Sequence, residues 1–405
     1  MKPLSIMLIA GEASGDLLGA ELVSALREEV ALAAAQPTAD VQPLRASLAP
    51  RFFGAGGPRM AEAGVEIAVD MTAHAVIGLG DVLRKYSFFR RVKDQLLDLA
   101  IERQPDAVVC VDFSGFNRRF GHALKQHVRA RAGWFHAWDP RLVQFVSPQV
   151  WASRPSRAEK MARDFDLLLS IFPFEKDWYA KRTPGFRVEF VGHPMVDRYG
   201  ARTELSRNES EAPLVVLLPG SRVGELKRHL PPMLGAWRQL RSARPNLRAR
   251  MVLPKEELIE LARALGSVDG IDLQLGDLPE ALRAATVAIA STGTVTMECA
   301  WFGVPTVTLY KTSWSTYQVG KRIVTVPSLT MPNLLAGGTV FPEFVQHDAT
   351  GENLARAAGE LLDSPERRER IRARLAEVIA TLGAPGAARR AARCIAELIF
   401  NPPTR

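Results

Sequence analysis

A short polar turn interrupts apolar sequence in the second half of the chain and carries groups that bind phosphate. Residues 214–218 (LVVLL) are apolar throughout, as in a buried strand, and Val223 begins a stretch with helical spacing. Between them, Gly220 permits a sharp turn with exposed backbone N–H groups, Ser221 adds a hydroxyl and Arg222 adds a guanidinium. A guanidinium binds phosphate through two parallel hydrogen bonds. The turn therefore predicts a phosphate-binding site.

A second turn of this kind follows the apolar run 287–291, and consists of Ser291, Thr292, Gly293 and Thr294. The start of a helix presents free N–H groups and favours an anion. Glu298 lies about one turn into the predicted helix, and its side chain leans back toward the turn. A carboxylate there suits a ribose diol, so the two turns together predict a site for a nucleoside diphosphate. The alternative is that Glu298 only complements the helix dipole.

Glycine-rich turns also occur in the first half of the chain. The run GEASGD places Gly11, Glu12, Ser14 and Asp16 directly after an apolar stretch, and FFGAGGPRM follows at residues 52–60. Neither matches the dinucleotide-binding fingerprint. Both predict loops that approach a ligand closely, with functionless tight turns as the alternative. No histidine cluster with metal-ligand spacing occurs, so the sequence predicts a reaction without a metal or other cofactor.

These turns are positioned by alternating strands and helices. We predict strands at 4–10, 51–54, 107–112, 143–147, 167–172, 187–191, 214–218, 249–253, 271–275, 287–291 and 304–309. Such alternation predicts an α/β fold with two Rossmann-like, doubly wound domains facing a central cleft. The polar run 198–213 is the predicted linker, and residues 28–50 read as a loop-rich insertion. We predict domains at 1–205 and 206–384, and a helical segment at 385–405 that packs back on the first domain.

The composition limits the kinds of partner. The 405 residues carry a formal net charge of +8, which suits a phosphate-rich partner, but no nucleic-acid-binding motif accompanies it. No run approaches the length of a membrane span, and the N-terminal apolar run is read as a strand rather than a signal sequence. The three cysteines lack the spacing of a disulfide framework or a zinc site, so we expect a cytoplasmic protein.

Eight ordered motifs resemble the lipid-A-disaccharide synthase family, which is glycosyltransferase family 19 with the GT-B fold. They are AGEASGD, GAGGPRM, VSPQVWA, FPFE, VGHP, LLPGSR, STGT…ECA and MPNLLAGG. The resemblance implies an inverting enzyme of lipid A biosynthesis. Such an enzyme moves 2,3-diacylglucosamine from UDP to the 6-hydroxyl of 2,3-diacylglucosamine 1-phosphate. The products are lipid A disaccharide 1-phosphate and UDP. A homodimer on the cytoplasmic surface of the inner membrane is also implied.

The resemblance assigns the candidate residues to three groups. UDP is expected at Gly220, Ser221, Arg222, Ser291, Thr292, Gly293, Thr294, Glu298 and Asn333, with Arg222 and Asn333 also stabilising the leaving group. The acceptor is expected at Gly11, Glu12, Ser14, Asp16, Asn117 and Trp151, with Arg154 as a further lining residue. The alternative for Trp151 and Arg154 is that they only anchor their loop. Membrane or acyl-chain contact is expected at Val76, Ile77, Leu79, Val82, Leu83, Phe88 and Phe89, where cations interleave with apolar residues. An ordinary core-facing helix is the alternative for this last stretch.

One position departs from the family pattern. The family has a second aspartate after the first-domain strand, where it is thought to act as or orient the catalytic base, and this chain has Gly115 in the run VDFSGFN. We expect Asp112 to replace it, although Asp112 could instead cap the turn. A slow enzyme, or an inactive relative that only binds lipid or UDP, is therefore an alternative. A second alternative is a UDP-sugar epimerase of the same fold.

Overall fold

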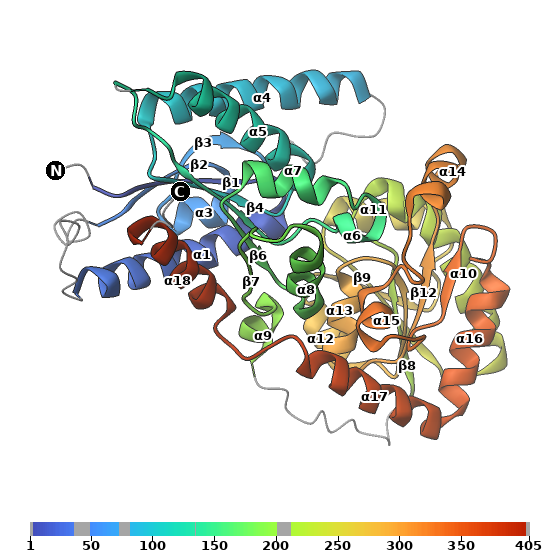
Figure 1. The fold of residues 1–405 in the computed structure, drawn as a ribbon. Coiled ribbons are helices and arrows are strands. Elements are labelled where there is room, and N and C mark those ends of the chain that lie inside the picture. The colour runs from blue at the N-terminus through green and yellow to red at the C-terminus, as the bar shows by residue number, and fades with distance from the viewer. Residues whose placement is uncertain (1–2, 36–48, 73–81, 134, 201–211, 402–405) are drawn as a thin grey trace. The chain divides into compact units, whose positions relative to one another are not determined.

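A computed structural model describes residues 3–35, 49–72, 82–133, 135–200 and 212–401. Contacts between Cα atoms group the chain into two compact units, Met1–Gly200 with Leu382–Arg405 and Ala201–Thr381. Each unit contains one sheet of parallel strands with helices packed against it (Figure 1). Two parallel sheets with interleaved helices confirm the predicted α/β class. Among the helices of the described ranges, none combines the length and apolar character needed to cross a bilayer.

The sheet of the first unit has the order β3-β2-β1-β4-β5-β6-β7. Its strands are β1 (Ser5–Ala10), β2 (Arg51–Gly56), β3 (Glu66–Asp70), β4 (Ala107–Val111), β5 (Arg141–Phe145), β6 (Leu167–Ser170) and β7 (Val188–Phe190). The chain builds outward from β1 to β3, then returns to the other side of β1 with β4. Ala10 lies opposite Val111 in the register, so β1 and β4 end together. Their carboxyl ends are the point where the strand order reverses, and such a point opens a crevice.

The sheet of the second unit repeats this plan with the order β10-β9-β8-β11-β12-β13. Its strands are β8 (Leu214–Leu218), β9 (Arg248–Leu253), β10 (Ile271–Leu275), β11 (Val287–Ser291), β12 (Thr306–Tyr310) and β13 (Glu343–Val345). The strand order reverses between β8 and β11. Leu218 lies opposite Ala290, so these two strands end close together. Every residue of these two strands is buried, which explains their continuous apolar sequence.

Helices cover both sheets. Those of the first unit are α1 (Ala13–Ala35), α3 (Pro58–Glu62), α4 (Val82–Arg103), α5 (Ser114–Arg131), α6 (Val150–Ser153), α7 (Arg157–Asp164), α8 (Pro173–Arg182), α9 (Pro194–Tyr199) and α18 (Ala387–Phe400). Those of the second unit are α10 (Val223–Ala243), α11 (Glu256–Leu265), α12 (Leu278–Ala284), α13 (Val295–Trp301), α14 (Trp314–Ile323), α15 (Met331–Ala336), α16 (Gly351–Asp363) and α17 (Pro365–Ala380). A separate apolar core lies within each unit.

The last helix belongs to the first unit although its sequence is distant. α18 packs along α1, where Arg389 Nε lies 2.8 Å from Glu29 Oε1. The carboxylate of Asp197 accepts hydrogen bonds from the backbone N–H groups of Gly386 and Ala387, and so holds the start of α18. These contacts give the C-terminal segment a fixed place against the first sheet's helices.

Several boundaries differ from the sequence-based expectation. Residues 28–35 continue α1 as a helix and are not a loop, while residues 36–48 of the predicted insertion lie outside the described ranges. The strands β3 and β13 were not predicted. β3 exposes alternate residues and begins and ends on acidic side chains, and β13 has only three residues, so neither has the apolar run of a central strand. Most of the predicted linker also lies outside the described residues.

A buried carboxyl group anchors the loop that follows β5. Glu175, at the start of α8, is fully buried, and its Oε1 accepts a hydrogen bond of 3.0 Å from Trp151 Nε1. The ring of Phe174 packs edge-on against Trp151 at 4.9 Å. Burial raises the pKa of Glu175 to about 7, although the bond from Trp151 opposes the shift. The folded protein therefore keeps a proton on Glu175 that the unfolded chain releases at lower pH.

This raised pKa predicts a loss of stability with rising pH. The ordinary pKa of 4.5 applies to the unfolded chain, so the loss begins near pH 4.5 and is complete above about pH 7. In Glu175→Gln, which retains an acceptor for Trp151, the decrease in unfolding free energy between pH 5 and pH 8 should be smaller by about 2–3 kcal/mol. Urea unfolding at both pH values measures this, with exposed Glu159→Gln as the control. Equal decreases in wild type and Glu175→Gln would contradict the assignment.

Candidate active site

The two predicted phosphate-binding turns lie side by side in the second unit. Pro219–Arg222 follows β8, and Thr292–Thr294 follows β11. β8 and β11 are neighbouring parallel strands, so both turns leave the same carboxyl edge at the point where the strand order reverses. The structure therefore brings together the two groups of residues that the sequence placed on separate turns.

A carboxylate from α10 lies against the first turn. Glu225 Oε2 accepts a 3.1 Å hydrogen bond from the backbone N–H of Ser221, and Glu225 Oε1 lies 3.3 Å from Arg222 Nη1. Gly220 has φ +117°, and a Cβ there would lie 2.5 Å from Glu225 Oε2, so only glycine fits. The turn and the guanidinium thus hold an anionic group of this chain. Glu225 was not predicted as a site residue, although its spacing of three residues from Arg222 was a usable signal.

A histidine joins this turn to the loop after β12. His229 on α10 is buried, and its Nδ1 donates to the backbone oxygen of Pro219 at 2.9 Å. Its Nε2 accepts from the backbone N–H of Lys311 at 3.1 Å. Burial lowers the pKa of His229, so the neutral ring with hydrogen on Nδ1 is favoured. His229 therefore fixes the approach to the turn, a role the sequence analysis did not predict.

The turn after β11 is open and rich in donors. Gly293 has φ +151°, no atom lies within 4 Å of the place that a Cβ would take there, and Thr294 is exposed. Thr296 Oγ1 donates to Gly293 O at 2.7 Å and holds the turn from behind. The first N–H groups of a helix have no acceptor within that helix. Glu298 is half-buried in α13, while Ser291 is buried at the end of β11.

The side chain of Asn333, which was predicted to contact UDP, is hydrogen-bonded within the chain. The side chain is buried, and its Oδ1 accepts from the backbone N–H groups of Val340 and Phe341, both at 2.8 Å. Its Nδ2 donates to Phe341 O and to Glu343 Oε1, also at 2.8 Å. All hydrogen-bonding capacity of the amide is used within the chain. Asn333 therefore shapes the segment after α15, and direct contact with a diphosphate would first require these bonds to break.

The first unit has a matching edge where β1 and β4 end. Gly11 is buried after β1, and a Cβ there would lie 2.3 Å from the ring of Phe113, which follows β4. The close packing of these two turns requires glycine at this position. Glu12 is half-exposed and Ser14 is exposed at the start of α1. These residues and the turn after β4 form one polar edge within the first unit.

Asp16, which was predicted on the acceptor side, holds a neighbouring loop through its carboxylate. The carboxylate is buried, and Oδ1 accepts from the backbone N–H groups of Gly57 and Met60 at 2.7 and 3.1 Å. Its Oδ2 accepts from Arg59 N at 3.0 Å. Asp16 thus supports the N-terminal end of α3 from a distant part of the sequence. It joins the motifs AGEASGD and GAGGPRM into one structure.

The turn after β4 has an unusual backbone that buried amides hold in place. Asp112 and Phe113 have φ of +48° and +38°, values that are costly for residues other than glycine. The backbone oxygen of Asp112 accepts from Asn117 Nδ2 at 2.8 Å and from Gln144 Nε2 at 3.0 Å. Both amide side chains are buried, so they position the turn. Gln144 was not predicted, because its partner is distant in sequence.

The side chain of Asp112 is half-exposed at this edge, and Gly115 is exposed one residue into α5. No atom lies within 4 Å of the position that a Cβ of Gly115 would take. An aspartate therefore fits at residue 115 without displacing a neighbour.

The predicted membrane-contact stretch is only partly described. Val76, Ile77 and Leu79 lie outside the described residues, as do the side chains of Val82 and Leu83. Phe88 and Phe89 on α4 are half-buried and pack on the core of the first unit, and Phe89 lies 5.6 Å from Phe113 between ring centres. α4 therefore reaches the turn that carries Asp112. Trp151 on α6 is buried, and its Nε1 donates a hydrogen bond to Glu175 Oε1.

Comparisons with known proteins agree over nearly the whole chain. The model of a family described as lipid-A-disaccharide synthetase matches residues 6–399. A lipid-A-disaccharide synthase of Geobacter sulfurreducens is 35% identical, with 97% of both chains covered. One of Trichlorobacter lovleyi is 36% identical, with 98% of both covered.

Two solved structures show the same fold at low sequence identity. The UDP-GlcNAc 2-epimerase of Neisseria meningitidis bound to UDP-GlcNAc has a TM-score of 0.54 at 12% identity, covering 98% of this chain and 99% of its own. CalG4, the calicheamicin glycosyltransferase, has a TM-score of 0.55 at 15% identity, covering 100% of both chains. These likenesses show the architecture shared by GT-B glycosyltransferases and epimerases.

Proposed function

The chain belongs to the lipid-A-disaccharide synthase family and is a glycosyltransferase of lipid A synthesis, and on this basis we propose how its residues divide the reaction. The second unit binds the UDP of the donor, and the first unit binds the acceptor sugar. The transferred group is 2,3-diacylglucosamine, and the acceptor is 2,3-diacylglucosamine 1-phosphate. The observation that carries this division is that each sheet reverses its strand order at the turns that hold the motif residues.

UDP is held at the edge formed by β8 and β11. Its diphosphate takes the place of the Glu225 carboxylate, which already accepts from Ser221 N and pairs with Arg222. The N–H groups of Gly293 and Thr294 provide further donors, and Glu298 accepts from the ribose hydroxyls. As the bond to C1 breaks, negative charge collects on the diphosphate, and donors already in place stabilise it. Arg222 has the principal role because its guanidinium offers two parallel bonds.

The acceptor hydroxyl is activated at the edge formed by β1 and β4. Its oxygen attacks C1 of the donor sugar from the face opposite UDP, which inverts the configuration. The released proton passes to the carboxylate of Asp112 or to water. Asn117 and Gln144 fix the backbone of Asp112, so they act as positioning residues. Asp16 and Asn333 likewise support loops.

The acyl chains of both substrates require that the enzyme work at a membrane surface. We place it on the cytoplasmic face of the inner membrane, with the apolar and basic residues of the 76–93 stretch toward the lipid. Part of α4 supports this assignment, because Arg90 and Arg91 are exposed on the same helix as Phe88 and Phe89.

Family membership over nearly the whole chain does not favour the epimerase alternative. The deciding experiment supplies UDP-diacylglucosamine and diacylglucosamine 1-phosphate together. Disaccharide 1-phosphate and UDP should form in equal amounts, and neither should form without the acceptor. Turnover of a water-soluble UDP-sugar without an acceptor would instead indicate an epimerase. Thermal stabilisation by UDP without any product would indicate a binding protein.

The leaving-group role of Arg222 predicts a selective kinetic defect. Arg222→Ala should lower kcat by about 10- to 100-fold, because it removes a charged hydrogen-bond donor from the transition state. The KM for the acceptor should change less than about twofold. Steady-state rates of UDP release measure both, and Lys227→Ala, exposed one turn further along α10, is the matched control. An equal loss in acceptor binding would rule out this role.

The position of Gly115 predicts a gain of activity. Gly115→Asp should raise kcat by about tenfold or more if a general base is missing, since such a base contributes about 10²–10⁴-fold. The exposed site accommodates the side chain, and Gly115→Asn is the control of equal size without a base.

The same experiment includes Asp112→Asn, since asparagine tolerates the left-handed backbone at this position. It should reduce turnover in the wild-type background and have little effect beside Gly115→Asp. If Gly115→Asp and Gly115→Asn had the same rate as wild type, no base would be missing at residue 115.

A further inference from the structure

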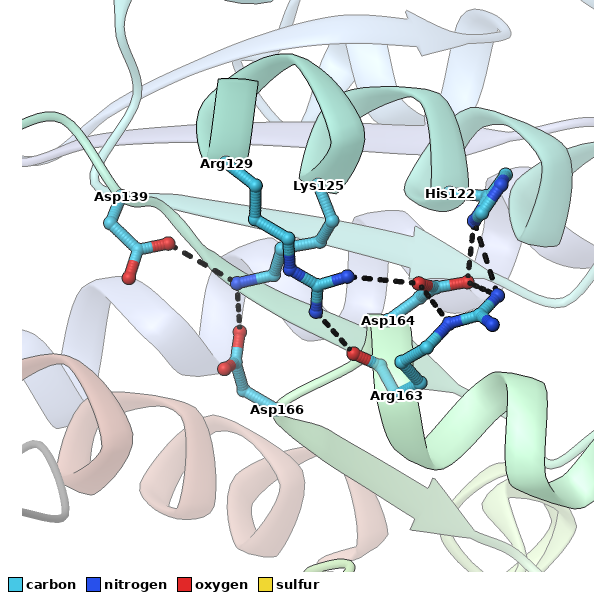
Figure 2. Close-up of polar contacts among 7 residues, drawn as sticks. All are labelled: His122, Lys125, Arg129, Asp139, Arg163, Asp164 and Asp166. Atoms are coloured by element: carbon cyan, nitrogen blue, oxygen red, sulfur yellow. Dashed lines mark hydrogen bonds and ion pairs between the residues drawn. The ribbon is translucent and has the colours of Figure 1, made fainter. Parts of the chain in front are cut away.

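One face of α5 carries a row of basic side chains. Arg118, His122, Lys125 and Arg129 are spaced by four, three and four residues, so they share one side of the helix. α5 packs against α7. Figure 2 shows the part of the row from His122 to Arg129 with its acidic partners.

Along most of this row, each basic side chain has a carboxylate as a partner. Lys125 is buried, and its Nζ lies 2.9 Å from Asp166 Oδ2 and 3.3 Å from Asp139 Oδ1. Asp164 is 1% exposed and lies 2.9 Å from His122 Nδ1 and 3.3 Å from Arg163 Nε.

Arg129 completes this network. Its Nη1 lies 3.8 Å from Asp164 Oδ1. The three carboxylates of the network are therefore shared among cations toward the C-terminal end of α5 (Figure 2).

Near the N-terminal end of α5, basic side chains lie together without forming ion pairs to carboxylates of the described residues. Arg118, Arg154 and Arg157 form no ion pair with any carboxylate of the described residues. Arg157 begins α7, and its backbone N–H donates to Arg154 O at 3.0 Å, so these two residues share one turn. Arg118 and Arg157 are half-buried, and Arg154 is exposed. We refer to Arg118, Arg154 and Arg157 as the arginine cluster.

The packing of α5 against α7 brings Arg118 toward Arg154 and Arg157, and their charges affect one another. Burial lowers the pKa of Arg118, and the charges of Arg119 and Arg154 lower it further, with partial compensation from Asp164. Burial likewise lowers the pKa of Arg157, followed by the charges of Arg118, Arg154 and Arg119. Like charges gathered in this way destabilise the folded protein unless an anion joins them.

The arginine cluster lies near the turn that carries Asp112. α5 begins at Ser114 directly after this turn, and Arg118 is about one helical turn, or roughly 5 Å, further along. α6 and Arg154 follow the carboxyl end of β5, which is the neighbour of β4 in the sheet. Both parts of the cluster therefore belong to the same edge of the first sheet as Asp112.

We propose that Arg118, Arg154 and Arg157 form a phosphomonoester-binding site, occupied by the phosphate of the acceptor sugar. This rests on the proposed function, because only the acceptor carries such a group. A phosphomonoester has nearly two negative charges at pH 7 and three acceptor oxygens, and arginine side chains bind it with parallel hydrogen bonds. The site holds the acceptor by the end opposite its attacking hydroxyl, and so sets the distance from that hydroxyl to Asp112.

The test compares two acceptors that differ only in the phosphate. Wild type, Arg118→Ala, Arg154→Ala and Arg157→Ala are assayed in neutral detergent micelles with diacylglucosamine 1-phosphate and with the methyl glycoside of diacylglucosamine. Each variant should raise the KM and the equilibrium Kd for the phosphorylated acceptor by about 10- to 100-fold. The values for the methyl glycoside and the KM for the donor should stay within about twofold of wild type. Lys160→Ala and Arg131→Ala, exposed on α7 and α5, are the controls.

Three results would overturn the proposal. One is an equal rise for both acceptors, which would mean that the arginine cluster is structural. Another is unchanged affinity for the phosphorylated acceptor. The third is that the variants lose binding to phosphatidylglycerol vesicles but keep the wild-type affinity for the phosphorylated acceptor, which would assign the cluster to lipid headgroups. Because Kd is measured without turnover, a wild-type protein that binds the phosphorylated acceptor selectively but makes no product would contradict the proposed function alone.

Discussion

Both candidate sites depend on one topological constraint. Connections between parallel strands are right-handed, so a chain that builds a sheet in both directions from a central strand must place consecutive helices on opposite faces. At the reversal, the two turns that leave the carboxyl edge diverge and leave their backbone N–H groups accessible. In this protein the reversals lie between β1 and β4 and between β8 and β11. The motif residues are gathered at these two places, although the members of each pair are far apart in the sequence.

The two edges treat negative charge in opposite ways. At the second unit's edge, the chain supplies its own anion, because Glu225 accepts from Ser221 N and pairs with Arg222. On our proposal, a diphosphate entering there exchanges one anion for another, and Glu225 holds the turn in its absence. At the first unit's edge, the arginine cluster forms no ion pair with a carboxylate of the described residues, and the charge of Asp164 offsets only part of the repulsion at Arg118. Like charges kept together raise the free energy of the empty site. On our proposal, the phosphate of the acceptor removes this repulsion when it binds, and this contributes to affinity independently of contacts with the sugar.

The sequence predicts the parts of this structure that depend on local pattern. The central strands are continuous apolar runs, and 214–218 and 287–291 have the bounds that were predicted. The sequence alone cannot show which polar side chains face a ligand. Asp16 and Asn333 belong to motifs that suggest binding, yet each is buried with its oxygen atoms occupied by backbone N–H groups. Asp16 and His229 bridge segments brought together only by folding, so no local spacing reveals these roles.

The backbone at Asp112 connects these observations. Two successive left-handed residues are costly, and the protein maintains them with two buried amides that both donate to one backbone oxygen. Such a cost is tolerated where the direction of a side chain matters more than stability. Positioning of reactants contributes more to rate than one general base does. An edge that fixes the Asp112 turn, and that on our proposal also anchors the far end of the acceptor, can therefore sustain transfer although residue 115 is glycine.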